Sequence, residues 1–154
     1  SLALSGPAMD VSYPVPFHKV MMSRLLSRAL PRLRFGGGVD DNLVCGDLGV
    51  GRAYTADPYN HGKVSARWFS EYLKLIQMVK LRAEDIQIPV AIWHGAQDGL
   101  VAPWVGRQFF ELLRVERKQF KEISGALHEI LYEKSWPETV DEIHAWFEGG
   151  PRKA

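Results

Sequence analysis

An aspartate and a histidine stand directly after two candidate strands of this chain. Asp98 follows the continuous apolar run "PVAIWHG" at residues 89–95, and His128 follows a short strand candidate at Gln119–Ile123. Ligands of open parallel sheets sit beyond the carboxyl ends of the strands, so loops that leave one edge can bring these side chains together. An aspartate that accepts the Nδ1–H of a histidine leaves Nε2 free to take a proton from a nucleophile. The pattern predicts that Asp98 orients His128 for base chemistry.

Each of these residues also has a purely structural interpretation. Asp98-Gly99 is a common turn dipeptide, and a single histidine near a strand end is usually structural. The occurrence of both residues together favours a catalytic role. Each follows a candidate strand, the acid precedes the histidine, and a C-terminal helix follows. His94 is expected to pack or to form hydrogen bonds. Gly95 and Gly125 are expected to let the two loops turn sharply.

The last third of the chain alternates strands and helices. This order predicts a parallel sheet with helices on its faces. The expected elements are strands at Pro89–Trp93 and Gln119–Ile123, a helix that begins at Pro103, and a helix opened by "SWPE" at 135–138. The Ser-x-x-Glu spacing predicts a capping box at Ser135, with Val140, Ile143 and Phe147 facing inward.

The first part of the chain is a short strand followed by a mostly helical stretch. Leu2–Leu4 is a strand candidate that ends in turn residues. Helices are expected at Phe17–Leu30 and Asp47–Ala56, and from an N-cap at Ser65 to about Lys80. "RFGGGVDDN", at 34–42, is interpreted as a flexible connector. We therefore expect an α/β fold with about three parallel strands: 1–10 as a core strand, 11–83 as a helical cap insertion, and 84–154 as the rest of the core.

Composition excludes several classes of protein. Hydrophobic residues make up 46% and charged residues 24% of the 154 residues, which is typical of a globular protein. A formal net charge of +1 gives no general attraction to nucleic acid. The single Cys45 cannot form an internal disulfide.

"HEILY" begins like a zinc motif, but Tyr132 occupies the second ligand position, so no metal or cofactor is expected. With no apolar run of membrane-span length and no basic leader, the expected location is the cytoplasm.

Four stretches resemble the α/β-hydrolases, and most closely their monoglyceride lipase and lysophospholipase branch, also described as serine aminopeptidase-like hydrolases. They are "LALSGPAM" at 2–9, "YTADPYNHGKVSARWFSEYL" at 54–73, "HGAQDGLVAP" at 94–103 and "GALHEILYE" at 125–133. The resemblance implies a partial α/β-hydrolase fold, with Asp98 as the acid and His128 as the base of a Ser-His-Asp triad. It also implies ester or lipid substrates such as monoacylglycerols and lysophospholipids.

The nucleophile of that triad is absent from the sequence. Such enzymes carry Gly-x-Ser-x-Gly on a strand-to-helix turn upstream of the acid, and these 154 residues contain no such motif. The nucleophile and the oxyanion donors are therefore expected in an N-terminal half that precedes this chain. We expect the chain to be the C-terminal portion of a serine ester hydrolase, and to be inactive alone.

The basic stretch "HKVMMSRLLSRALPRLRF", at 18–35, has two interpretations. The favoured one is a solvated basic face over a packed apolar stripe. The other is a basic amphipathic helix that rests on an anionic membrane surface, so that the protein is membrane-associated. In that case an acyl chain would pass along Met21, Met22, Leu25 and Leu26.

A second hypothesis belongs to another class of function. The strand at 2–4 leaves an apolar edge that could pair with a partner chain. The chain would then be a non-catalytic interaction domain with a partial hydrolase fold.

Overall fold

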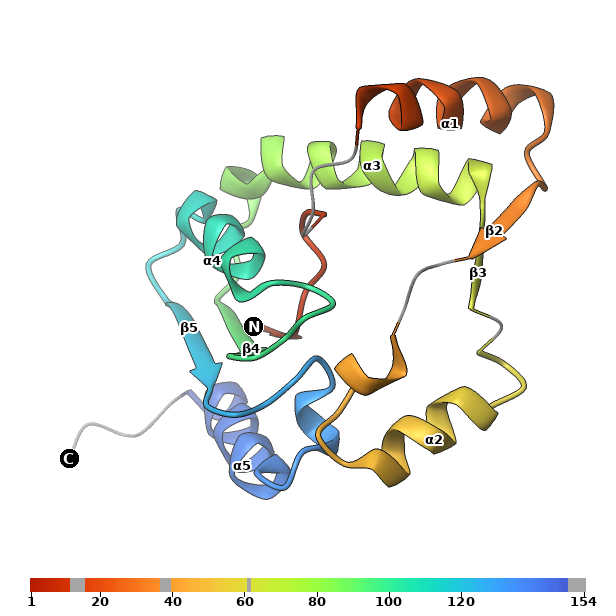
Figure 1. Ribbon diagram of the computed structural model, residues 1–154. Helices are drawn as coiled ribbons and strands as arrows, with labels where there is room; N and C mark the ends of the chain where they lie inside the picture. The colour runs from red at the N-terminus through yellow and green to blue at the C-terminus, as the bar shows by residue number, and fades with distance from the viewer. Residues whose placement is uncertain (12–15, 37–39, 61, 150–154) are drawn as a thin grey trace.

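The chain folds around a parallel sheet of three strands, which lies toward one side of the molecule (Figure 1). The computed structural model describes residues 1–11, 16–36, 40–60 and 62–149. The strands are β1 (Leu2–Ser5), β4 (Val90–Gly95) and β5 (Lys118–Ile123), in the spatial order β1-β4-β5. The prediction of about three parallel strands is confirmed.

The central strand β4 is buried on both faces, which explains why its sequence is a continuous apolar run rather than an alternating one. Its side chains alternate between two hydrophobic clusters. Ala91 and Trp93 point to one face and Val90 and Ile92 to the other. The first cluster is completed by Ile123, Ala126, Ile130 and Trp146, and the second by Ala83, Phe109 and Leu113.

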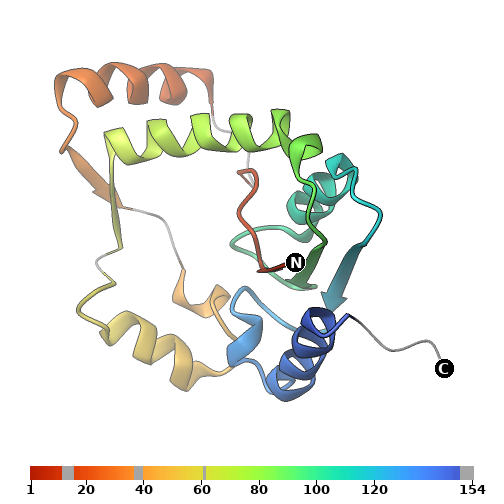
Figure 2. The same cartoon turned by 180° about the vertical axis from the view of Figure 1, so that it is seen from behind.

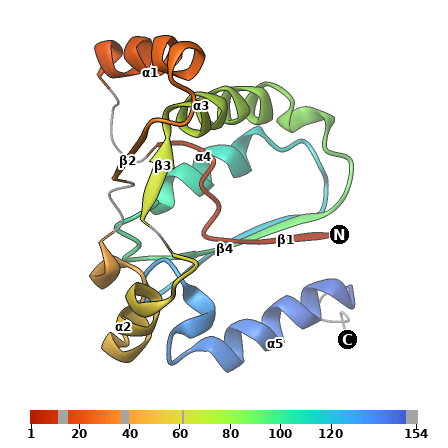
Figure 3. The ribbon, with the colours of Figure 1, turned by 90° about the vertical axis from the view of Figure 1, so that its right-hand side faces the viewer.

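Two helices cover opposite faces of the sheet (Figure 3). Helix α4 (Pro103–Leu112) packs against one face, and its first residue is a proline, whose missing N–H is not needed at that position. Helix α5 (Trp136–Phe147) packs against the other face through Trp146. The strand and helix alternation that the sequence predicts for this part of the chain is confirmed.

Two details predicted for α5 are wrong. Ser135 makes no side-chain capping bond. Val140 and Phe147 are exposed by 41% and 54%, whereas Thr139 and Trp146 are buried. Ile143 packs against the first cluster as predicted, but the other two inward positions, Thr139 and Trp146, each lie one residue before the predicted ones. Trp146 decides the orientation, because its indole N–H donates to the carbonyl of Leu2 at 3.2 Å while its ring packs in the core.

The segment between β1 and β4 is mostly helical. Helix α1 (Phe17–Ala29) and helix α3 (Ala66–Leu81) lie side by side and antiparallel (Figures 1 and 2). Helix α2 (Leu48–Ala56) lies apart from them, on the side of α5. Ser65 caps α3 as predicted, since its hydroxyl accepts the amide N–H of Trp68 at 3.1 Å. Short 3-10 turns span Asp41–Leu43, Ala83–Asp85 and Ile130–Tyr132.

A small antiparallel sheet replaces part of the predicted connector. Strand β2 (Arg34–Gly36) pairs with β3 (Lys63–Ser65), so that Phe35 lies opposite Val64. The interpretation of "RFGGGVDDN" as a connector is wrong for its first three residues, because their partner strand lies far along the chain. Residues 37–39 of that stretch lie outside the described residues.

Helix α1 exposes the side chains that were expected to pack. Met21 and Leu25 are exposed by 58% and 64%, whereas Ser23 is buried. The interpretation of a packed apolar stripe beneath a basic face is therefore wrong for Met21 and Leu25. Across the described residues, none of the helices is both long and apolar enough to span a bilayer.

Candidate active site

Asp98 and His128 meet at the carboxyl edge of the sheet. Asp98 lies three residues beyond β4, and His128 lies five residues beyond β5. The Nδ1 atom of His128 is 2.7 Å from Oδ2 of Asp98. The Asp98 side chain is fully buried, whereas 26% of the His128 side chain is exposed. The predicted contact between the two loops is confirmed.

The other oxygen of the carboxylate is held by its own loop. Oδ1 of Asp98 accepts the backbone N–H groups of Leu100 at 2.9 Å and Val101 at 2.8 Å. Such local turns are typical of aspartate. Here the turn fixes the direction in which the carboxylate presents Oδ2 to His128.

His94 also reaches the carboxylate, from inside the sheet. Its Nε2 atom is 2.8 Å from the carbonyl of Val101 and 3.1 Å from Oδ2 of Asp98. Both neighbours are acceptors, so Nε2 carries the proton. Nδ1 is buried and has no hydrogen-bond partner among the described residues. The expected packing and hydrogen-bonding role of His94 is confirmed, but its contact with Asp98 was not predicted.

The two loops shift each other's pKa values. Burial alone would raise the pKa of Asp98, but hydrogen bonds from His128, His94 and the Val101 amide outweigh burial and hold this pKa well below its ordinary value. The hydrogen bond to Asp98 raises the pKa of His128, against the opposing effect of burial. The carboxylate is therefore charged at neutral pH, and it accepts the Nδ1–H of His128.

Glycines allow the loops to approach. Gly125 has a φ of +75°, which confirms the predicted turn there. Gly95 has a different role from the predicted one, because a Cβ at this position would lie 1.8 Å from the carbonyl oxygen of Leu127. Close approach of the histidine loop to β4, rather than a turn, requires this glycine. Gly6 has a φ of +47°, and a Cβ there would lie 3.3 Å from ring atoms of His128.

Glu133 ties the histidine loop to a segment from the first half of the chain. Its Oε1 atom accepts the N–H groups of Gly46 and Leu127, both at 2.9 Å. The N–H of Glu129 donates to the carbonyl of Val44 at 2.8 Å. The sequence alone does not predict this role, since no motif spacing links Glu133 to Gly46.

The four apolar residues expected to guide an acyl chain lie on α1. Met21 and Leu25 line a groove between α1 and α3. Met22 is also exposed, and Leu26 is half-buried. Figures 1 and 2 both place α1 away from the loop that follows β5 and carries His128. In the described part of the chain, no group of three or more His, Cys, Asp and Glu side chains could hold a metal ion.

The sequence matches known hydrolases over nearly its whole length. A family described as serine aminopeptidase, S33 matches residues 1–135. A monoacylglycerol lipase of Mycolicibacterium smegmatis is 27% identical over 147 residues, which are 95% of this chain and 52% of that protein. The phospholipase YtpA of Bacillus subtilis is 26% identical over 145 residues, or 94% of this chain and 55% of that protein. The chain thus spans about half the length of these relatives.

Solved structures of lipases share the fold. The crystal structure of Paleococcus ferrophilus monoacylglycerol lipase superposes with a TM-score of 0.86 at 28% identity, over 94% of this chain and 56% of that one. A monoglyceride lipase variant from Saccharomyces cerevisiae superposes with a TM-score of 0.79 at 21% identity, over 95% of this chain and 52% of that one. The parallel sheet and its flanking helices correspond to part of this α/β-hydrolase fold.

Proposed function

The chain belongs to the serine aminopeptidase S33 family, and from this premise we propose that Asp98 and His128 are the acid and base of a serine ester hydrolase. The nucleophilic serine would come from a segment outside these 154 residues, since they contain no Gly-x-Ser-x-Gly. The observation that carries the proposal is the 2.7 Å hydrogen bond between His128 Nδ1 and Asp98 Oδ2.

The tautomer of His128 suits it to act as a base. Because Nδ1–H donates to the carboxylate, the lone pair of the neutral ring lies on Nε2, which has no hydrogen-bond partner among the described residues. Nε2 would take the serine proton as the serine oxygen attacks the ester carbonyl, and would then give that proton to the departing alkoxide. Asp98 stabilises the imidazolium in between. In the second half of the reaction, Nε2 would take a proton from the water that attacks the acyl carbonyl, and would give it to the serine oxygen as the acyl–serine bond breaks.

The proposed substrates are carboxylic esters of lipids. The relatives include a monoacylglycerol lipase and a phospholipase, which supports monoacylglycerols and lysophospholipids as the substrate class. We propose that Met21, Met22, Leu25 and Leu26 guide the acyl chain. Long, flexible thioether side chains adapt to an irregular apolar ligand.

Contact with a membrane surface is a further part of the proposal. Three of the four acyl-guiding residues are more than half exposed, and cationic side chains on α1 flank them. An apolar ridge beside positive charge is the arrangement that binds an anionic lipid surface. The protein would then act in the cytoplasm at a membrane face.

The test is turnover of p-nitrophenyl esters by the longer gene product, with and without His128→Ala. Loss of the base is expected to lower kcat by roughly a thousandfold or more. His144→Ala is the control, because the side chain of His144 is 72% exposed on α5. Near-normal turnover of His128→Ala would remove His128 from the mechanism.

A second experiment locates the nucleophile. The purified chain 1–154 is expected to show no esterase activity and no covalent labelling by a fluorophosphonate probe. Labelling of a serine in this chain would contradict the proposal that the nucleophile lies elsewhere.

The alternative function is a non-catalytic interaction domain. Among the described residues, β1 forms one edge of the sheet, and its side chains Leu2, Ala3 and Leu4 are half-buried. An exposed edge strand can accept a strand from another chain. The genomic sequence upstream of Ser1 discriminates between the two functions: a continuous frame that encodes Gly-x-Ser-x-Gly supports the enzyme, and a start codon next to Ser1 supports the interaction domain.

A further inference from the structure

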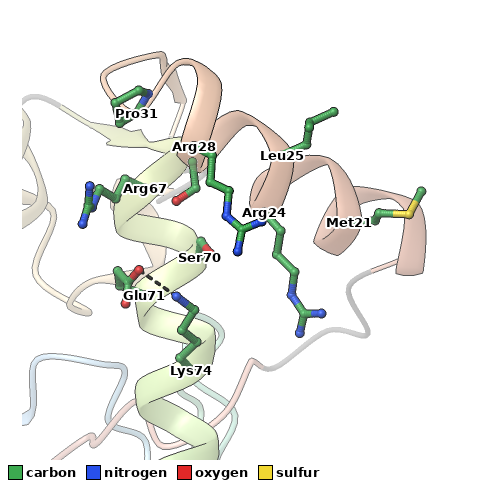
Figure 4. A pocket seen from close by; sticks show the side chains of 10 residues that line it. Met21, Arg24, Leu25, Arg28, Pro31, Arg67, Ser70, Glu71 and Lys74 are labelled. Carbon is green, nitrogen blue, oxygen red and sulfur yellow. Dashed lines mark hydrogen bonds and ion pairs between the residues drawn. The ribbon is translucent and has the colours of Figure 1, made fainter.

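A groove of about 830 Å³ runs between α1 and α3 (Figure 4). Cationic side chains dominate its lining: Arg24 and Arg28 come from α1, and Arg67 and Lys74 from α3. The one acidic side chain in the lining is Glu71, which already pairs with Lys74 at 2.9 Å. The groove therefore has a surplus of positive charge.

Among the described residues, the arginines of the groove form no ion pair, and the nearby Asp10 pairs with Lys80 instead. Residues 11–39 contain no aspartate or glutamate, so α1 offers no acidic partner of its own. Within the described residues, no carboxylate lies within ion-pair distance of Arg24 or Arg28. Like charges one helical turn apart destabilise a helix by a few tenths of a kcal/mol. A bound anion would remove this repulsion.

The cationic side chains are exposed, and all four line the same groove. Figure 4 shows Arg28 reaching from α1 toward Ser70 of α3, with Arg24 extending downward beside it, whereas Arg67 points to the other side of α3. Ser70 is 4% exposed and lines the groove. Arg24, Arg28, Lys74 and Ser70 thus line one groove, which is large enough for a small ligand.

We propose that this groove binds the phosphate group of a single-chain lipid. Guanidinium groups match phosphate oxygens in a bidentate geometry, and a phosphate monoester carries a charge of about −1.5 to −2 at pH 7. Lys74 adds a point charge, and Ser70 can donate its hydroxyl hydrogen. Met21 and Leu25 form an apolar wall at the same groove, where the carbon chain of the lipid would lie.

The inference goes beyond the proposed hydrolase. Binding needs neither Asp98 nor His128, and neither of them lines the groove. Failure of the binding experiment would leave the hydrolase proposal intact, and loss of the hydrolase proposal would leave the groove unchanged.

The experiment is calorimetric titration of the chain 1–154 with three probes. The first is 1-O-hexylglycerol 3-phosphate, whose ether link cannot be hydrolysed as an ester. The second is 1-O-hexylglycerol, which lacks the phosphate, and the third is inorganic phosphate. The lipid phosphate is expected to bind at least about tenfold more tightly than either of the others, because only it engages both the cations and the apolar wall.

Variants assign the binding to the groove. Arg24→Gln with Arg28→Gln is expected to weaken binding of the lipid phosphate at least about tenfold, and Arg24→Lys with Arg28→Lys to weaken it less, since charge remains without the bidentate fork. Arg114→Gln with Lys134→Gln removes the same charge at exposed positions outside the groove and is expected to keep the wild-type affinity. Circular dichroism confirms that each variant is folded.

Three results would overturn the inference. Failure of the folded chain to bind the lipid phosphate would remove the site. Equal weakening by the control pair would show attraction to overall charge rather than a groove. Inorganic phosphate that binds as tightly as the lipid phosphate would show a site for free phosphate and would overturn the lipid assignment.

Discussion

His94 and His128 approach the same oxygen atom of one buried carboxylate. Nε2 of His94 is 3.1 Å and Nδ1 of His128 is 2.7 Å from Oδ2 of Asp98. His94 approaches from the end of β4 and is fully buried, whereas His128 belongs to the loop after β5 and is partly exposed. His94 and the loop amides therefore fix the carboxylate independently of any ligand.

The first prediction concerns His94 itself. His94→Ala removes a buried ring and one donor to Asp98, and it is expected to lower the free energy of unfolding by about 2–4 kcal/mol. Urea denaturation measures this change. His144→Ala, at an exposed position on α5, is expected to change the free energy by less than about 0.5 kcal/mol. A similar small change for both variants would show that His94 does not support the carboxylate.

The second prediction separates backbone strain from contact with His128. Gly6 and Gly62 both have positive φ values, +47° and +56°. A Cβ at Gly6 would meet ring atoms of His128, whereas a Cβ at Gly62 would have no described atom within 4 Å. Alanine at either position is expected to cost about 1 kcal/mol of backbone strain. Only Gly6→Ala should also move the NMR signals of the His128 ring. Equal spectra for the two variants would contradict the packing of His128 on Gly6.

The third prediction concerns the buried carboxylate beneath the histidine loop. Glu133→Ala leaves the N–H groups of Gly46 and Leu127 without their acceptor, and it is expected to lower the free energy of unfolding by about 2–4 kcal/mol. Glu133→Gln keeps an amide oxygen as acceptor, so it should lower the free energy of unfolding by less than half as much as Glu133→Ala. Glu111→Ala, at an exposed site, is the control. If Glu133→Ala lowered the free energy of unfolding no more than the control does, Glu133 would not connect the two segments.

The fourth prediction is a pH dependence of stability. The hydrogen bond to Asp98 raises the pKa of His128 on folding, so its stabilising contribution is complete below about pH 6.5 and is lost as the pH rises through the folded pKa. The pKa of Asp98 falls on folding, because the hydrogen bonds outweigh burial, so its contribution is present above about pH 3.9 and is lost on acidification. The pair therefore stabilises the fold most between about pH 4 and 6.5.

Urea denaturation at several pH values tests the alkaline side of this dependence. His128→Ala should show a smaller loss of stability between pH 6 and pH 9 than the wild-type chain. Parallel curves for the two proteins would contradict the raised pKa of His128.

The sequence was sufficient for the features that depend on local patterns. Apolar runs and turn residues predicted the three parallel strands, and Ser65 predicted the start of α3. The contact between Asp98 and His128 followed from a general property of parallel sheets, since loops after neighbouring strands share one edge.

The features that the sequence could not predict depend on partners far apart in the chain. Arg34–Gly36 becomes a strand only because Lys63–Ser65 lies beside it. The Glu133 carboxylate accepts the N–H of Gly46, and no spacing rule connects these two residues. The side of α5 that faces the core differs from the predicted side because Trp146 packs in the core and donates a hydrogen bond to Leu2. This contact joins the two ends of the described chain.

The central claim is that Asp98 accepts the Nδ1–H of His128 and so leaves Nε2 as the base. Long-range proton–nitrogen NMR of the chain 1–154 tests it directly, because the nitrogen shifts of an imidazole report which atom carries the proton. At a pH above the His128 pKa we expect the Nδ1–H tautomer, and we expect a pKa above about 6.5 that falls in Asp98→Asn. An Nε2–H tautomer, or a pKa that Asp98→Asn leaves unchanged, would contradict the claim.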